Sequence, residues 1–83
     1  MIGGLTMVRV TFGRWLKVRR GVVGISQVKL GEILGVTPQT VGNWEKGATF
    51  PLLDIRMIKP FSEALGVSVE SLVNAVDGVE MDD

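Results

Sequence analysis

The stretch ISQVKLGEILGVTPQTVGNWEKG, residues 25–47, decides the fold of this chain. Apolar residues recur at intervals of three and four on both sides of the dipeptide Gly35-Val36, which predicts one helix over about residues 27–34 and a second over about 38–46. Because so short a connection leaves no chain for an antiparallel return, the second helix must cross the first steeply. The stretch therefore predicts a helix-turn-helix.

The ends of both helices carry recognisable signals. Ser26 and Thr37 precede the two helices as side-chain caps, and Pro38 stands at a first helical position, where the missing N–H does no harm. Gly35 and Gly47 follow the two helices, and glycine readily adopts the left-handed conformation that ends a helix. Each of the two helices thus has a sequence signal at its start and another at its end.

Helical spacing divides the residues of this unit between an inner and an outer face. The apolar ones are expected to form one cluster: Leu30, Leu34, Val36, Val41 and Trp44. With these turned inward, the residues left facing outward on the second helix are Pro38, Gln39, Gly42, Asn43 and Lys46. Gly31, which has no side chain, lets the two helices approach each other closely.

The remaining chain predicts three more helices. Thr11 caps a first helix over 12–22, whose inner face is expected to carry Phe12, Trp15, Leu16 and either Val22 or Val23. The segment 54–65 also has helical spacing, but Pro60 lies inside it, so either the helix is kinked or a short turn over 54–58 precedes a helix that begins near Pro60. We expect the second arrangement. Ser68 caps a last helix that ends near Val76.

The fold class that follows is all-α, a compact bundle of five short helices. Residues 11–76 form the domain, residues 1–10 an N-terminal arm and residues 77–83 an acidic tail. Alternating residues in the arm suit an extended segment, for which disorder, contact with a DNA backbone and pairing with a second arm all remain open.

Composition excludes several classes of function. The 83 residues include no cysteine and no histidine, which removes disulfides, thiol nucleophiles, the common zinc sites and imidazole catalysis. No apolar run approaches the length of a membrane span, and no signal peptide is evident. We expect a cytoplasmic protein that is not an enzyme and binds neither metal nor cofactor.

The net charge of zero hides a strong asymmetry along the chain. All nine basic residues lie between Arg9 and Lys59, where only three acids oppose them, a balance of +6. From Pro60 onward there are no basic residues and six acids, a balance of −6. A basic working face and an acidic end held away from the ligand are typical of a protein that binds nucleic acid.

The outer face of the second helix of the unit points to the ligand. Gln39 and Asn43 are four residues apart and therefore lie on one side of the helix. Their amides carry a donor beside an acceptor, which matches adenine N6 and N7 in the major groove of DNA. Positions suited to the DNA backbone, at helix starts or with basic side chains, are held by Ser26, Gln27, Thr37, Pro38, Lys46, Lys29, Lys17 and Arg14.

Residues 16–76 resemble the lambda-repressor/Cro-like helix-turn-helix family, often called the XRE family. The residues that carry the resemblance are Leu16, Arg20, Ser26-Gln27, Leu30, Leu34-Gly35-Val36-Thr37, Thr40-Val41, Asn43-Trp44-Glu45-Lys46-Gly47, Pro51 and Ala64-Leu65-Gly66-Val67-Ser68. The resemblance implies a five-helix bundle that inserts its third helix in the major groove, commonly as a homodimer on a palindromic operator.

Carried onto this chain, the resemblance implies that Gln39 and Asn43 read bases and that Gln27 anchors a phosphate. It also implies a structural ion pair between Arg20 and Glu45. Three features depart from the family pattern: Arg19 replaces an apolar residue, Pro38 replaces a polar one, and the spacing from Pro51 to Leu65 is longer than usual.

The function expected from these residues is sequence-specific regulation of transcription, repressor-like and nucleoid-associated, with double-stranded DNA as the ligand. Since one chain offers a single recognition helix, a homodimer is expected, with the last helix around Leu72, Val73 and Val76 as its interface. The alternative is a protein-interaction module, antitoxin-like, that uses the same fold to bind a protein partner through its last two helices and acidic tail.

Overall fold

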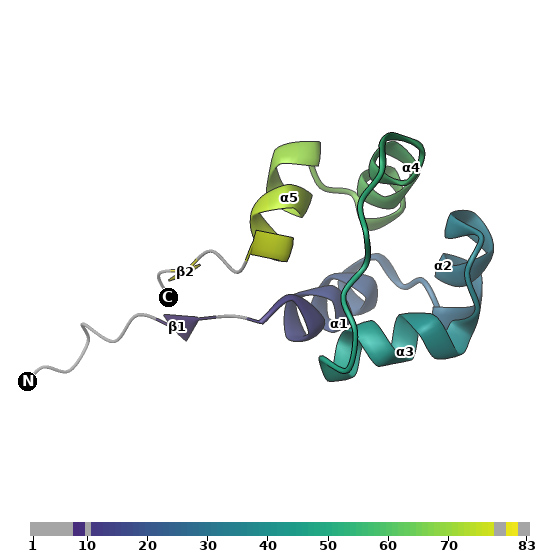
Figure 1. The fold of residues 1–83 in the computed structure, drawn as a ribbon, viewed down its shortest axis with the longest axis horizontal. Coiled ribbons are helices and arrows are strands. Elements are labelled where there is room, and N and C mark those ends of the chain that lie inside the picture. Colours follow the sequence, from purple (N-terminus) through teal and green to yellow (C-terminus); the bar gives the residue numbers. More distant parts are fainter. Residues whose placement is uncertain (1–7, 10, 78–79, 82–83) are drawn as a thin grey trace, which may run out of the picture.

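The structure is a computed structural model that describes residues 8–9, 11–77 and 80–81. Five helices occupy the part of the chain that it describes: α1 (Phe12–Val23), α2 (Gln27–Leu34), α3 (Pro38–Lys46), α4 (Ile55–Leu65) and α5 (Val69–Asp77). They pack around one core and confirm the all-α fold class (Figure 1). No helix among the described residues is long and apolar enough to cross a membrane.

The predicted caps form at the first three helices. The hydroxyl of Thr11 accepts a hydrogen bond from the backbone N–H of Arg14, and the hydroxyls of Ser26 and Thr37 do the same for the third residue after each. Satisfying these otherwise unpaired N–H groups stabilises each helix start by about 1 kcal/mol. The helix-turn-helix therefore begins and ends where its sequence signals predict.

Of the two arrangements open for α4, the structure contains the helix that includes Pro60, and the turn that we expected over 54–58 is wrong. Ile55–Leu65 is one helix with Pro60 inside it, in place of a turn followed by a helix from Pro60. It begins early because the Asp54 carboxylate accepts hydrogen bonds from the N–H groups of Arg56 and Met57, both at 2.9 Å. Burial of Phe61 and Leu65, both at 0 % exposure, then holds the helix together across the proline.

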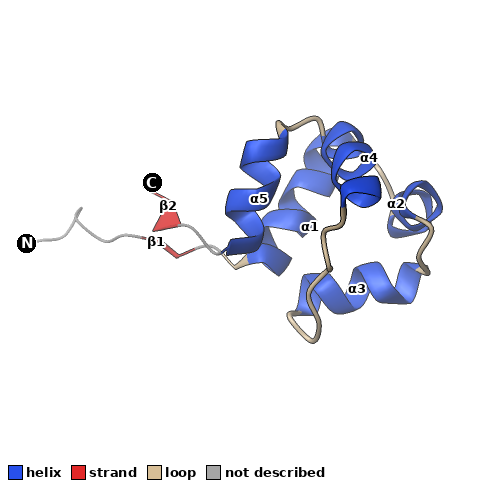
Figure 2. Ribbon diagram, turned by 45° about the horizontal axis from the view of Figure 1, so that its top comes forward, coloured by secondary structure: helices blue, strands red, loops and turns tan. Residues whose placement is uncertain are grey.

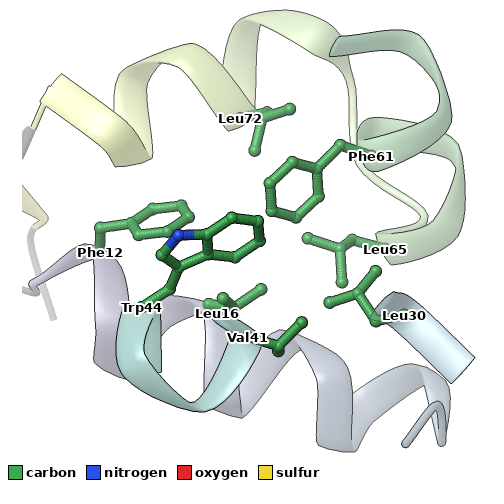
Figure 3. Close-up of a cluster of buried hydrophobic side chains, with 8 residues drawn as sticks. All are labelled: Phe12, Leu16, Leu30, Val41, Trp44, Phe61, Leu65 and Leu72. Carbon is green, nitrogen blue, oxygen red and sulfur yellow. The ribbon is translucent and has the colours of Figure 1, made fainter. Parts of the chain in front are cut away.

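The core joins all five helices through eight buried side chains (Figure 3): Phe12, Leu16, Leu30, Val41, Trp44, Phe61, Leu65 and Leu72. The rings of Trp44 and Phe61 stack with centroids 5.7 Å apart, so α3 is fastened to α4. Trp15 is half-buried and stacks on Phe12, as expected of a residue that packs against the core. Trp44 is a core residue and takes no part in the surface.

Some predicted core positions lie at the surface instead. Val22 is 65 % and Val23 39 % exposed. Arg19, one turn before Val23, packs on the end of α4 with its Nε 2.7 Å from the carbonyl oxygen of Leu65. The apolar face of α1 is therefore shorter than its spacing suggests.

The two ends of the described chain meet in a short antiparallel pair. Strands β1 (Val8–Arg9) and β2 (Glu80–Met81) place Val8 opposite Met81. Part of the predicted arm therefore pairs with the predicted acidic tail of the same chain, and α5 includes Asp77, the first residue of that tail. The other residues of the arm and the tail, namely 1–7, 10, 78–79 and 82–83, lie outside the described residues.

Candidate nucleic-acid interface

The turn between α2 and α3 is closed by backbone contacts. Gly35 adopts the left-handed conformation with φ of 74°, and the N–H of Val36 donates to the carbonyl of Gly31 at 2.9 Å. A Cβ on Gly31 would lie 2.6 Å from the carbonyl oxygen of Val36, closer than real Cβ atoms come. The absent side chain thus brings the turn itself against α2, and this contact holds α3 across its neighbour.

Helix α3 turns one face into the core and leaves another at the surface. Val41 is 0 % and Trp44 4 % exposed, whereas Gln39 is exposed and Asn43 is half-buried. Figures 1 and 2 both place α3 along the lower edge of the molecule, with no other element beneath it. The two amides that the sequence identified therefore lie on an accessible helix face, and neither is enclosed by the chain.

The two capping residues place a hydroxyl at the start of α2 and another at the start of α3. Ser26 and Thr37 are both exposed, and each hydroxyl oxygen accepts a backbone N–H of its own helix. Thr37 also shares a hydrogen bond with the hydroxyl of Thr40 at 2.9 Å. Both residues orient helix N-termini, whose free N–H groups and positive dipole end suit an anion.

The ion pair implied by the family resemblance is present and extends further than expected. Arg20 Nε donates to Glu45 Oε2 at 2.6 Å, and its NH2 group donates to Glu45 Oε1 at 3.2 Å. The remaining guanidinium nitrogen donates to the carbonyl of Ile25 at 3.0 Å. Gln27 joins the same carboxylate, with its Nε2 3.0 Å from Glu45 Oε1. The pair ties α1, the start of α2 and the end of α3 together.

The environment of Glu45 keeps its carboxylate ionised. Burial by itself raises the pKa of Glu45, but the hydrogen bonds from Arg20 and Gln27 and the charges of Arg20 and Lys17 outweigh it, so the pKa lies below its ordinary value. The hydrogen bond from Arg20 to Glu45 correspondingly raises the pKa of Arg20, against a smaller opposing effect of burial. Both groups are charged at neutral pH.

The basic residues proposed for DNA phosphates are exposed and come from three helices. Arg14 follows Gly13, which lies against the carbonyl of Trp44 near the end of α3. Lys17 is close enough to Glu45 for its charge to act on that carboxyl. Lys46 is the last residue of α3, while Lys29 lies on α2 and forms a weak exposed pair with Glu32 at 3.8 Å. The structure thus brings Arg14, Lys17 and Lys46 toward the end of α3, and Lys29 lies on the neighbouring helix.

Sequence reasoning missed two residues that position α1. A Cβ on Gly13 would lie 2.6 Å from the carbonyl oxygen of Trp44, so the glycine permits the close approach of α1 and α3. Arg19, which departs from the family pattern, donates to the carbonyls of Leu65 and Gly66 at the end of α4. A positive charge at the C-terminus of a helix is favourable. In the sequence, the only sign of this role was that Arg19 stands where the family has an apolar residue.

The predicted dimer interface on α5 is not free. Leu72 is 0 % exposed and belongs to the core, while Val73 is half-buried and Val76 is half-buried against the core. Large apolar side chains are instead exposed where the chain runs from α3 to α4. Phe50 is 59 %, Leu52 88 % and Ile55 87 % exposed. The two most exposed large apolar side chains, Leu52 and Ile55, thus lie beside the helix-turn-helix.

Comparison with known proteins agrees with this geometry. The profile of the helix-turn-helix family matches residues 16–72. The chain is 37 % identical over 62 residues to YonR of Bacillus subtilis, described as an uncharacterised HTH-type transcriptional regulator derived from the SPbeta prophage. That match covers 75 % of this chain and 56 % of YonR, so it spans little more than half the length of that relative. YgzD of the same organism, another uncharacterised HTH-type transcriptional regulator, is 49 % identical over 57 % of this chain and 74 % of its own.

Solved structures give the same result. The P22 c2 repressor in complex with a synthetic operator has a TM-score of 0.65 at 27 % identity, over 80 % of this chain and 97 % of its own. SinR, a master regulator of biofilm formation solved with DNA, has a TM-score of 0.61 at 27 % identity, over 76 % of this chain and 98 % of its own. HppE, solved with Co(II) and substrate, has a TM-score of 0.60 at 34 % identity, but only 33 % of its length is matched.

The matched residues 16–72 contain the glycine turn, the outward amides and the buried ion pair described above. A family profile that spans more than half of the chain, the two relatives and the fold all indicate the same family. The chain belongs to the XRE-type helix-turn-helix family, with a lambda-repressor-like five-helix fold.

Proposed function

We propose that this protein is a DNA-binding transcriptional regulator that inserts α3 in the major groove and reads bases with Gln39 and Asn43. The observation that carries the proposal is the pair of accessible amides on one side of α3, held outward by the burial of Val41 and Trp44. Two amides at this spacing can form paired hydrogen bonds with adenines on neighbouring base pairs.

The DNA backbone contacts in this proposal surround the two readers. Ser26, Gln27, Thr37 and Pro38 lie at the starts of α2 and α3, where free N–H groups suit phosphates. The exposed cations Arg14, Lys17, Lys29 and Lys46 supply the charge that draws in the duplex. The relatives named as transcriptional regulators and the repressors solved on DNA support the same assignment. Because the proposed ligand is the DNA of the nucleoid, we expect this protein to act in the cytoplasm.

The experiment that tests base reading starts with selection of bound sequences from random duplex DNA. Gln39→Ala and Asn43→Ala should each weaken binding to the selected operator by about 1–3 kcal/mol, with little change on unrelated DNA. Asn74→Ala, a substitution of the same kind at an exposed position of α5, is the control and should bind as the unchanged protein does. Equal losses on every sequence would refute base reading by these residues.

The charge of the interface gives an independent measurement. Binding releases the counterions of each neutralised phosphate, so affinity should fall steeply as salt is raised. Lys46→Ala should reduce the slope of log K against log salt by about one unit, with similar loss on all sequences. A flat salt response in the unchanged protein would contradict the proposal.

We also propose a homodimer, with its contact on the exposed segment of Phe50, Leu52 and Ile55. Three large apolar side chains exposed within six residues are unusual for a protein that remains alone in water. The segment leaves the C-terminal end of α3, so a dimer contact on it lies beside the recognition helix of each copy. Pairing of two helices on a palindrome supplies affinity that one α3 lacks.

The dimer is tested by the concentration dependence of molecular mass in sedimentation. Leu52→Ser should shift the protein toward the monomer and leave its helical content unchanged, since Leu52 is 88 % exposed. Leu52→Ser is compared with Val22→Ser, which replaces an exposed valine of α1 and should leave the mass unchanged. A monomer at all concentrations, or stable binding of a different protein on this segment, would favour the protein-interaction alternative.

A further inference from the structure

The side chain of Gln27 is held between the ion pair and the bare backbone of α3. Its Nε2 lies 3.0 Å from Glu45 Oε1, and a Cβ on Gly42 would lie 3.5 Å from the same nitrogen. Gly42 precedes Asn43 and stands three residues after Gln39, between the two proposed base readers. The amide at the start of α2 therefore rests against the middle of the recognition helix.

This contact allows the amide only one orientation. A carboxylate accepts hydrogen bonds and cannot donate them, so the nitrogen of Gln27 and not its oxygen must face Glu45. The nitrogen has two N–H groups and uses one for Glu45. Among the contacts of the described residues, neither the second N–H nor Oε1 has a protein partner. The second N–H remains available for a ligand at the α2–α3 junction.

Arg20 makes this arrangement compatible with DNA. The Glu45 side chain is 6 % exposed and paired with a guanidinium at 2.6 Å, so its negative charge is balanced beside the junction. A free carboxylate there would repel a phosphate. A flexible glutamine would also lose rotamer freedom on binding, an entropic cost that a side chain already held in place avoids.

We infer that Glu45 is a positioning residue for DNA binding: it orients the Gln27 amide so that the second N–H donates to a phosphate lying across the start of α2. The inference rests on the proposed function and adds a second role to the ion pair. Arg20 and Glu45 stabilise the fold and, through Gln27, fix a donor of the interface. The contact is made with a phosphate and therefore acts on every DNA sequence.

A double-mutant cycle tests the inference in the full chain. Gln27→Met keeps the length and apolar contacts of the side chain and removes its hydrogen bonds, and Glu45→Gln removes the charge. Dissociation constants are measured for both variants and their combination, on the selected operator and on an unrelated duplex, at a temperature where circular dichroism shows all of them folded.

The expected result is a loss of roughly tenfold in affinity for each single variant on both duplexes, the effect of one hydrogen bond to a charged group. The combined variant should lose no more than Gln27→Met alone, because Glu45 acts on DNA only through Gln27. Losses that multiply, or no loss for Gln27→Met, would overturn the inference. A purely structural role of Glu45 predicts the same effect whichever residue occupies position 27.

The unchanged protein provides a second measurement that remains valid if Glu45→Gln does not fold. In a ¹⁵N-labelled sample, the side-chain amide protons of Gln27 should exchange with water more slowly than those of exposed Gln39, the matched control in the same molecule. On addition of DNA, one Gln27 proton should shift and the one bonded to Glu45 should stay. Equal, fast exchange of both glutamines would overturn the inference.

The outcomes separate the inference from the proposed function. Failure of the unchanged protein to bind any duplex, or an Asn43→Ala variant that binds the operator normally, counts against the proposed function. If both of those tests succeed and the cycle is additive, the proposed function stands and only the role of Glu45 is wrong.

Discussion

The helix-turn-helix over residues 26–47 and the segment over residues 48–65 that follows it are built differently. In the first, a polar cap begins each helix, a glycine ends it, and the most exposed large apolar side chain, Val28, is 53 % exposed. In the second, α4 also begins at a polar cap, Asp54, and is followed by Gly66, but Pro60 lies inside the helix, and Leu52 and Ile55 are 88 % and 87 % exposed. The difference indicates that local signals suffice for the first region, whereas the second also needs long-range contacts that hold its helix together across the proline.

The ion pair that fastens the helix-turn-helix gives the largest expected effect. Glu45→Ala leaves Arg20 without its partner at a position where the guanidinium side chain is only 18 % exposed. We expect a loss of about 3 kcal/mol in the free energy of unfolding, near the lower end for a broken buried pair. Chemical denaturation followed by circular dichroism measures it. Glu32→Ala, which breaks the exposed pair with Lys29, should change stability by less than about 0.5 kcal/mol.

The same pair predicts the direction of a pH effect. Because the pKa of Glu45 in the folded protein lies below its ordinary value of 4.5, its contribution to stability is complete above that value and is lost as the pH falls toward the lowered pKa. Thermal unfolding between about pH 6 and 3 should therefore show a steeper fall for the unchanged protein than for Glu45→Gln. If the unfolding temperatures of the two proteins fell in parallel with pH, the Glu45 carboxyl would have the same pKa in the folded and the unfolded chain.

Glycine substitutions sharpen the comparison within the first region. Gly31→Ala places a Cβ 2.6 Å from the carbonyl oxygen of Val36, so the turn must move, at a cost of about 1–3 kcal/mol. Gly21→Ala, in α1, meets nothing within 4 Å and should be neutral or stabilise by up to about 1 kcal/mol. The test is the unfolding temperature of each alanine variant compared with that of the unchanged protein. Equal shifts would show that the close contact at Gly31 is relaxed in solution.

A substitution in the second region should act in the opposite direction. Pro60→Ala restores an N–H donor to the interior of α4 and replaces the poorest helix former by the best. Part of that gain is offset by the freedom that alanine gives the unfolded chain and by lost contacts of the half-buried ring, so we expect a gain of about 1 kcal/mol. A lower unfolding temperature for Pro60→Ala would mean that the proline ring is an essential part of the core.

Much of the candidate interface was predictable because its signals are local. The bounds of α2 and α3, the caps at Ser26 and Thr37 and the outward position of Gln39 depend on residues within a few positions of each other. The ion pair of Arg20 and Glu45 followed from the family resemblance and is confirmed at 2.6 Å. Assignment of Gln39 and Asn43 to bases, and of the surrounding residues to phosphates, remains a prediction.

The sequence by itself determined the two helices, their glycine turn and the face that must be buried, because spacing and capping act over one or two turns of chain. Only the tertiary structure decided that α4 continues through Pro60, that Leu72 is enclosed, that Arg19 closes the end of α4 and that Gln27 joins the ion pair. Each of those depends on partners up to 46 residues away, for Arg19 and Leu65. Such contacts are set by how the helices pack, and no local pattern encodes them.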